Sequence, residues 1–218
     1  MSDTVARYRP VEEAWNTWTH GLGILLGAVA SVFLFRKAAH GEDVVWAYIC
    51  ISIYLAGMLF SYLSSTLYHG WKPGRTKELL RRFDHSAIYC HIAGTYTPFT
   101  LLVLRHEGYW GWGIFSFVWI CALGGSILSF MRLKEHSHLE TVCFVSMGGC
   151  ILVAMKPLLS RLSETGSTAA FWWLLAGGAS YILGAVLYSL RKPYMHALFH
   201  LFCLGGSVAH IIAIWLIL

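Results

Sequence analysis

Seven apolar stretches, each long enough to cross a membrane, constrain the fold of this chain more than any other feature. A membrane-spanning helix needs about 20 mostly apolar residues. The stretches cover residues 17–35, 44–68, 85–104, 110–130, 141–159, 169–189 and 195–217. Because the connections are short, each predicted helix packs antiparallel to the next. The pattern predicts an all-α, seven-transmembrane helix bundle over residues 17–218, preceded by an N-terminal segment of residues 1–16.

The composition supports an integral membrane protein and excludes other classes. Charged residues make up 12% of the chain, about half the share of roughly 25% in soluble domains. The six cysteines lie in apolar stretches without a CxxC pair, so neither a disulfide framework nor a thiolate metal site is indicated. The chain has no soluble basic surface with which it would bind nucleic acid.

The distribution of Lys and Arg among the loops predicts the orientation of the bundle. Loops on the N-terminal side hold eleven of the sixteen: Arg7, Arg9, Lys72, Arg75, Lys77, Arg81, Arg82, Arg132, Lys134, Arg191 and Lys192. The N-terminus is therefore expected in the cytoplasm, and with seven spans the C-terminus is expected outside.

Polar residues from three predicted spans reach one depth, near the cytoplasmic face. His196 and His200 open the seventh span and share one helix face at i and i+4. His69 ends the second span, with Ser65 one turn earlier, and Asp84 begins the third. Ionisable groups inside a membrane are costly and usually functional. The pattern therefore favours a functional site, although chance HxxxH spacing and local pairing of Asp84 with arginines are simpler alternatives.

Three imidazoles with an open fourth position are typical of a catalytic zinc site. The candidate ligands are His69, His196 and His200, and Zn²⁺ suits this set because the chain offers no cluster of sulfur ligands. Asp84 is predicted either to complete the ligand set or to take a proton from a water on the metal, as a general base. Ser65 is predicted to orient Asp84 or to donate a hydrogen bond to a developing oxyanion.

Other features of the same spans leave more than one interpretation open. Gly23 and Gly27 form a close-packing pattern, or reflect the frequency of glycine in spanning helices. Glu12 and Glu13 precede the first predicted span, so a peripheral or interfacial location is expected. His20 can support the metal site or make a helix-to-helix hydrogen bond.

Two further histidines fall within the predicted spans. A hydrogen bond in the core is expected for His91, and His210 is expected too deep to reach the cytoplasmic cluster.

The segments SSTLYH, FDHSAIY, IAGTYTPF and HALFHLF, in this order across seven spans, resemble the bacterial hemolysin III family. That family is related to the progestin and adipoQ receptors, including the adiponectin receptors, and more distantly to alkaline ceramidases. The resemblance covers essentially the whole chain. It implies zinc bound by His69, His196 and His200, with Asp84 and Ser65 at the family's motif positions, in a multi-pass protein of the bacterial inner (plasma) membrane.

Three functions follow in order of preference. The first is a zinc-dependent intramembrane hydrolase that cleaves the amide or ester of a membrane lipid, as ceramidases do, and serves membrane lipid homeostasis. The second is a membrane sensor or receptor in which zinc is structural. The third is a hemolysin-like lytic or channel protein, which the small number of polar residues in the outer half of the spans disfavours. The sequence identifies neither the lipid nor any protein partner.

Overall fold

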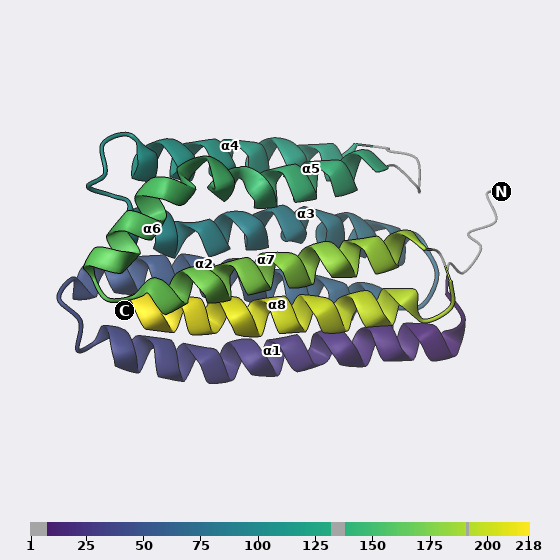
Figure 1. Cartoon of the computed structure of the whole chain (residues 1–218). Helices are drawn as coiled ribbons and strands as arrows, with labels where there is room; N and C mark the ends of the chain where they lie inside the picture. Colours follow the sequence, from purple (N-terminus) through teal and green to yellow (C-terminus); the bar gives the residue numbers. More distant parts are fainter. Residues whose placement is uncertain (1–7, 132–137, 191) are drawn as a thin grey trace.

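The computed structural model describes residues 8–131, 138–190 and 192–218. Every regular element in these ranges is a helix, which confirms the all-α prediction. In chain order they are α1 (Pro10–Ala38), α2 (Val44–Gly70), α3 (Arg75–Pro98), the π-helix η1 (Phe99–Val103), α4 (Trp110–Phe130), α5 (His138–Gly149), the 3-10 helix η2 (Cys150–Ala154), α6 (Met155–Glu164), α7 (Thr168–Ser189) and α8 (Met195–Ile217). The long helices lie side by side, and the starts of α1, α3 and α8 share one end of the bundle (Figure 1).

Six helical segments of the described chain are long and apolar enough to cross a membrane, which makes it a multi-pass membrane protein. They are α1, α2, α4, α7, α8 and the combined segment Leu139–Glu164. These segments correspond to six of the seven predicted stretches. The other stretch, 85–104, forms the end of α3 together with η1. The early turns of α3 carry Lys77, Glu78, Arg81 and Arg82, and these charges lower the mean hydropathy of the helix.

The first helix begins at Pro10, earlier than the apolar stretch that starts at residue 17. Proline suits the first position of a helix because its missing N–H would be unpaired there. Glu12 and Glu13 follow in the first turn, where the positive end of the helix dipole stabilises a carboxylate. Residues 10–16 are therefore helical and continue directly into the first apolar stretch.

Small residues bring the first three helices close together. A Cβ added to Gly23 would overlap the Tyr62 ring on α2, and one added to Gly27 would overlap Leu59. The close packing predicted for Gly23 and Gly27 is thus confirmed. Gly57 lies in the same way against the backbone carbonyl of Cys90 on α3. These contacts set the spacing of α1, α2 and α3.

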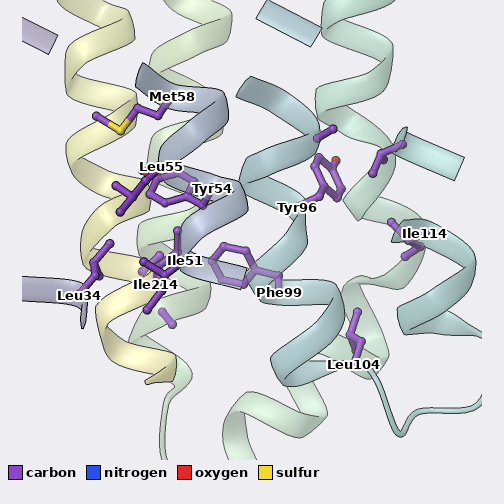
Figure 2. Packing of buried hydrophobic residues seen from close by; sticks show 14 of the residues in the cluster. Leu34, Ile51, Tyr54, Leu55, Met58, Tyr96, Phe99, Leu104, Ile114 and Ile214 are labelled. Atoms are coloured by element: carbon purple, nitrogen blue, oxygen red, sulfur yellow. The ribbon is translucent and has the colours of Figure 1, made fainter. Parts of the chain in front are cut away.

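The apolar core lies in the half of the bundle away from this shared end. Leu34 on α1, Ile51 and Tyr54 on α2 and Ile214 on α8 are fully buried against one another, with Phe99 of η1 beside them (Figure 2). Such contacts hold α1, α2 and α8 together in this half of the bundle. The candidate site lies at the opposite, polar end of the same three helices.

The fifth apolar segment is interrupted where a tyrosine from α3 enters its backbone. The Tyr96 hydroxyl donates to the carbonyl of Gly148 at 2.7 Å and accepts from the N–H of Ile151 at 2.9 Å. These bonds take the place of helical ones, so α5 ends at Gly149 and the chain passes through η2 into α6.

Four of the basic residues that predict the orientation lie outside the described residues. They are Arg7, Arg132, Lys134 and Arg191. The N-terminus in the cytoplasm and the C-terminus outside remain predictions.

Candidate metal centre

Three histidines from two helices meet at the end of the bundle where α1, α3 and α8 begin. His69 lies in the last turn of α2, and His196 and His200 lie in the first two turns of α8. One ring nitrogen of each lies within 4.8 Å of the other two, and His69 Nε2 is 3.0 Å from His196 Nε2. His69 and His200 are 2% and 1% exposed. This grouping can hold a metal ion.

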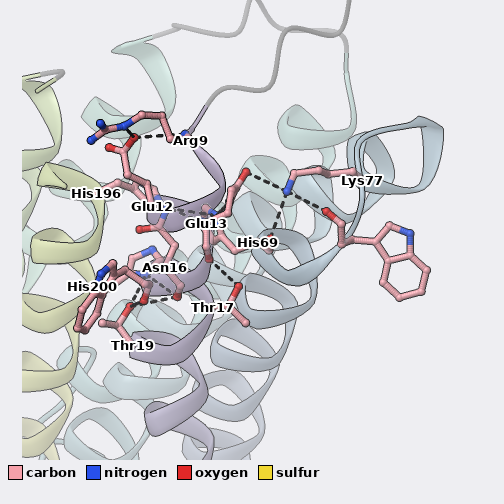
Figure 3. Close-up of polar contacts among 12 residues, drawn as sticks. Arg9, Glu12, Glu13, Asn16, Thr17, Thr19, His69, Lys77, His196 and His200 are labelled. Atoms are coloured by element: carbon pink, nitrogen blue, oxygen red, sulfur yellow. Dashed lines mark hydrogen bonds and ion pairs between the residues drawn. The ribbon is translucent and has the colours of Figure 1, made fainter. Parts of the chain in front are cut away.

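The His69 ring is oriented by a carboxylate on α1. Glu13 Oε2 lies 2.6 Å from His69 Nδ1 (Figure 3). A carboxylate only accepts, so Nδ1 carries the hydrogen and Nε2 presents its lone pair to the other two histidines. Glu13 Oε1 pairs with Lys77 Nζ of α3 at 2.9 Å. Metal-binding histidines commonly donate their second ring N–H to a carboxylate in this way.

The His200 ring is oriented by two groups on α1. Its Nδ1 lies 3.2 Å from the carbonyl oxygen of Asn16 and 3.1 Å from Thr19 Oγ1 (Figure 3). Because a carbonyl cannot donate, His200 Nδ1 carries the hydrogen and Nε2 has the lone pair. His20 stacks on this ring, with 3.4 Å between ring centroids. His20 therefore supports the site by packing.

The position of His196 depends on the turn that precedes α8. Tyr194 there has a φ of 62°, in the left-handed region, and its N–H donates to Glu12 Oε1 at 2.9 Å. The other oxygen of Glu12 accepts from the backbone and side chain of Arg9. Glu12 therefore ties the start of α1 to the residue two before His196.

These contacts correct the expectation for the two glutamates of α1. Glu12 is buried, and the Glu13 carboxylate contacts a candidate ligand, so neither is peripheral. A signal was present in the sequence, since Glu12, Asn16, Thr19, Gly23 and Gly27 recur every three to four residues. That spacing places them on one helix face, and this face lies against α2 and α8.

Ser65 and Asp84 lie beside the three histidines but outside the ligand group. Ser65 is one turn before His69 on α2, and its Oγ has no hydrogen-bond partner in the described part of the chain. Asp84 is on α3 and is 9% exposed. Both line the cavity that His196 and His200 also line. Of the five residues predicted to form the site, the three histidines are grouped as possible ligands, and Ser65 and Asp84 line the cavity beside His196 and His200.

A large cavity runs from these residues into the bundle. Its volume is about 760 Å³, and most of its walls come from α3, α5, α7 and α8. Val145 on α5, Leu152 on η2 and Ile182 on α7 line it and are also exposed on the bundle surface. The cavity thus reaches the lipid-facing side of the protein between α7 and the fifth apolar segment.

The sequence matches known proteins over nearly its whole length. The family model described as "Haemolysin-III related" matches residues 8–211. The "Hemolysin-3 homolog" of Bacillus subtilis (strain 168) is 42% identical over 199 residues, which cover 91% of this chain and 90% of the relative. "Hemolysin-3" of Bacillus cereus is 40% identical, covering 90% and 87%. The human "Monocyte to macrophage differentiation factor" is 30% identical over 218 residues, covering 96% and 86%.

Proposed function

Because the chain belongs to the haemolysin-III-related family and groups three histidines beside a lipid-facing cavity, we propose that it is a zinc-dependent intramembrane hydrolase. Its substrate is a membrane lipid, cleaved at an amide or ester bond in the manner of a ceramidase. Its role is the homeostasis of membrane lipids in the bacterial inner membrane. The observation that carries this proposal is the opening of an apolar cavity directly onto His196 and His200.

The proposed topology has seven spans, with α3 and η1 forming the third. The polar first half of α3 lies at the end of the bundle that holds the metal centre, and its apolar second half continues into η1. The excess of Lys and Arg at that end supports a cytoplasmic location for it. A reporter enzyme that is active only outside the cytoplasm, fused after Leu218, tests this topology: activity is expected, and its absence would place the C-terminus inside.

Zinc fits the donors that the chain offers. The ligands are three imidazoles whose Nε2 lone pairs, for His69 and His200, are directed by hydrogen bonds at Nδ1. Zinc binds three histidines and keeps a fourth position open in catalytic sites. Softer metals would favour sulfur ligands, and no cysteine of the described residues belongs to the three-histidine group.

The chemistry that zinc supplies at such a site is Lewis acidity toward a carbonyl and a water of lowered pKa. The residues of the chain perform the remaining steps. Asp84, buried on the cavity wall, would accept the proton of the attacking water and deliver it to the leaving group. The unpartnered Ser65 hydroxyl would donate a hydrogen bond to the carbonyl oxygen as negative charge develops there. The cavity holds the acyl chain away from water.

Metal analysis is the first experiment. The purified full chain is expected to contain about one zinc per chain, lost in His69→Ala and in His200→Ala, because a catalytic zinc site relies on three protein ligands. A panel of lipid amides and esters is then screened for release of fatty acid. Absence of zinc under chelator-free conditions would refute the metal site, and zinc without turnover across the panel would refute the hydrolase.

The second of these outcomes would favour a sensor with a structural zinc. A specific observation supports that alternative, since the ligands on α2 and α8 are each bonded to α1 through Glu13, Thr19 and Asn16. A metal there would tie three helices together. In that case His200→Ala lowers the thermal stability of the protein, with no enzymatic activity to lose.

A further inference from the structure

The cavity is lined by a second group of polar residues, separate from the three candidate ligands. The group consists of His91 of α3, Tyr181 of α7 and His210 of α8. His210 follows His200 by ten residues on one continuous helix, so it lies about 15 Å further along the axis. A simple alkyl chain requires only apolar walls at this depth.

The two histidines are buried and incompletely paired. His91 and His210 are 8% and 7% exposed. His91 Nε2 and His210 Nδ1 have no hydrogen-bond partner among the residues that the structure describes. Both rings lie near the Tyr181 ring, at 6.1 and 5.5 Å between centroids. Buried polar atoms normally have a partner, and inside a membrane an unsatisfied one is especially costly.

The missing partner of His210 must be a hydrogen-bond donor. His210 Nε2 lies 3.2 Å from the carbonyl oxygen of Leu174, and a carbonyl only accepts, so Nε2 carries the hydrogen. A charged imidazole is costly at this depth, and in the neutral ring Nδ1 is then an acceptor. An ether or a ketone cannot satisfy it, whereas an O–H can.

The position of the His210 ring is built into the fold. A Cβ on Gly177 of α7 would overlap the ring, so a glycine is required for the ring to lie against that helix. Tyr181, one turn later on α7, is fixed by its hydroxyl, which bonds Ser207 Oγ of α8 at 2.8 Å. Ser207 Oγ in turn bonds the Tyr62 hydroxyl of α2 at 2.7 Å. Residues of three helices therefore hold this part of the cavity wall in place.

We propose that His91 and His210 form a subsite for a hydroxyl group on the hydrocarbon tail of the ligand. A hydroxyl can donate to His210 Nδ1 and can either accept from or donate to His91 Nε2. The distance from the metal centre selects a hydroxyl near the middle or end of the chain and excludes one beside the carbonyl. The inference rests on the proposed function in one respect, since it places the ester or amide at the metal centre.

Ricinoleate and oleate provide a matched test, because they share chain length and double bond and differ by one mid-chain hydroxyl. Each is competed against a fluorescent fatty acid bound to the purified full chain. Ricinoleate is expected to bind about five- to tenfold more tightly, as one or two hydrogen bonds would give. The pair α-hydroxystearate and stearate, with its hydroxyl beside the carboxylate, is expected to show no such preference.

Two variants locate the preference. His210→Leu and His91→Leu are each expected to abolish it while oleate still binds, and His40→Leu, in an exposed loop, is the matched control that retains it. Equal affinities in the parent, or a preference that survives in both variants, would overturn the subsite. A variant that fails to fold is recognised by loss of oleate binding, and the parent and the other variant then decide.

Binding is measured without turnover, so this test is separate from that of the hydrolase. A ricinoleate preference without hydrolysis of any lipid would retain the subsite and remove the enzyme. Hydrolysis of a lipid without a preference for ricinoleate would retain the enzyme and remove the subsite.

Discussion

Glu13 is the most informative residue to change, because its carboxylate contacts a candidate ligand from another helix. Glu13→Gln retains the size of the side chain and removes its charge. In the parent, Glu13 Oε2 lies 2.6 Å from His69 Nδ1. A carboxylate in this place fixes the ring and makes its other nitrogen a stronger ligand. An amide has a weaker acceptor, so the metal affinity is expected to fall.

The expected loss can be bounded in two ways. Removing a group that orients a metal ligand typically weakens metal affinity by about 10- to 100-fold, or about 1.4–2.8 kcal/mol. A hydrogen bond to a charged group contributes about 1.5–3 kcal/mol. The His69 and Glu13 side chains are 0% and 15% exposed, so solvent screens this pair little. Both bounds predict a zinc Kd about 10 to 100 times higher.

The assay is competition for zinc between the purified full chain and a chromophoric chelator. Glu164→Gln is the matched control, since that carboxylate is exposed at the end of α6 and pairs with Arg161. Lys77→Met removes the ion pair between Lys77 and Glu13. Its effect on the zinc Kd is expected to be smaller, because the bond from Glu13 to His69 remains. If the Kd of Glu13→Gln stays within about twofold of the parent, Glu13 does not support the metal and the assignment is refuted.

Three further predictions test the reacting group and the packing. Asp84→Asn is expected to keep its zinc and lose about 10²- to 10⁴-fold in lipid hydrolysis; unchanged turnover would exclude Asp84 as the base. Tyr96→Phe removes the hydroxyl that bonds the Gly148 carbonyl and the Ile151 N–H and is expected to cost about 1–3 kcal/mol of stability, seen in thermal unfolding with the zinc Kd unchanged. Gly57→Ala is expected to cost about 1–3 kcal/mol by overpacking against α3, whereas Gly113→Ala, where a Cβ meets open space, should not; equal effects would contradict the close approach.

The grouping of the three histidines could be predicted from the sequence because their spacing reports geometry directly. His196 and His200 are four apart on a helix, so their shared face follows from the helical repeat alone. His69 and Asp84 were placed at the same depth by counting spans, and the structure brings both to the end of the bundle that holds His200. Apolar length predicted the helices for the same reason, since the requirement of the bilayer is local to each segment.

The contacts that support the ligands could not be predicted in this way. Glu13 lies 56 residues from His69 in the sequence, and a glutamate just before an apolar stretch normally remains at the interface. Its burial is tolerable because His69 and Lys77 are its partners, and those partners belong to other helices. The break at Gly149 is similar, because it depends on Tyr96, which is more than 50 residues away.

One face of α1 links the packing of the bundle to the metal centre. Its middle carries Gly23, which lets α1 lie against the Tyr62 ring, and Tyr62 is bonded through Ser207 to α8. Its first turns carry Glu13 and Asn16, which reach His69 on α2 and His200 on α8. A glutamate side chain and a backbone carbonyl both have a limited reach, so these bonds form only if α1 approaches both helices closely. The small residues in the middle of α1 therefore set its distance from α2 and α8, and this distance lets Glu13 and Asn16 orient the histidines. The stability of the bundle and the geometry of the candidate metal centre thus depend on the same helix contacts.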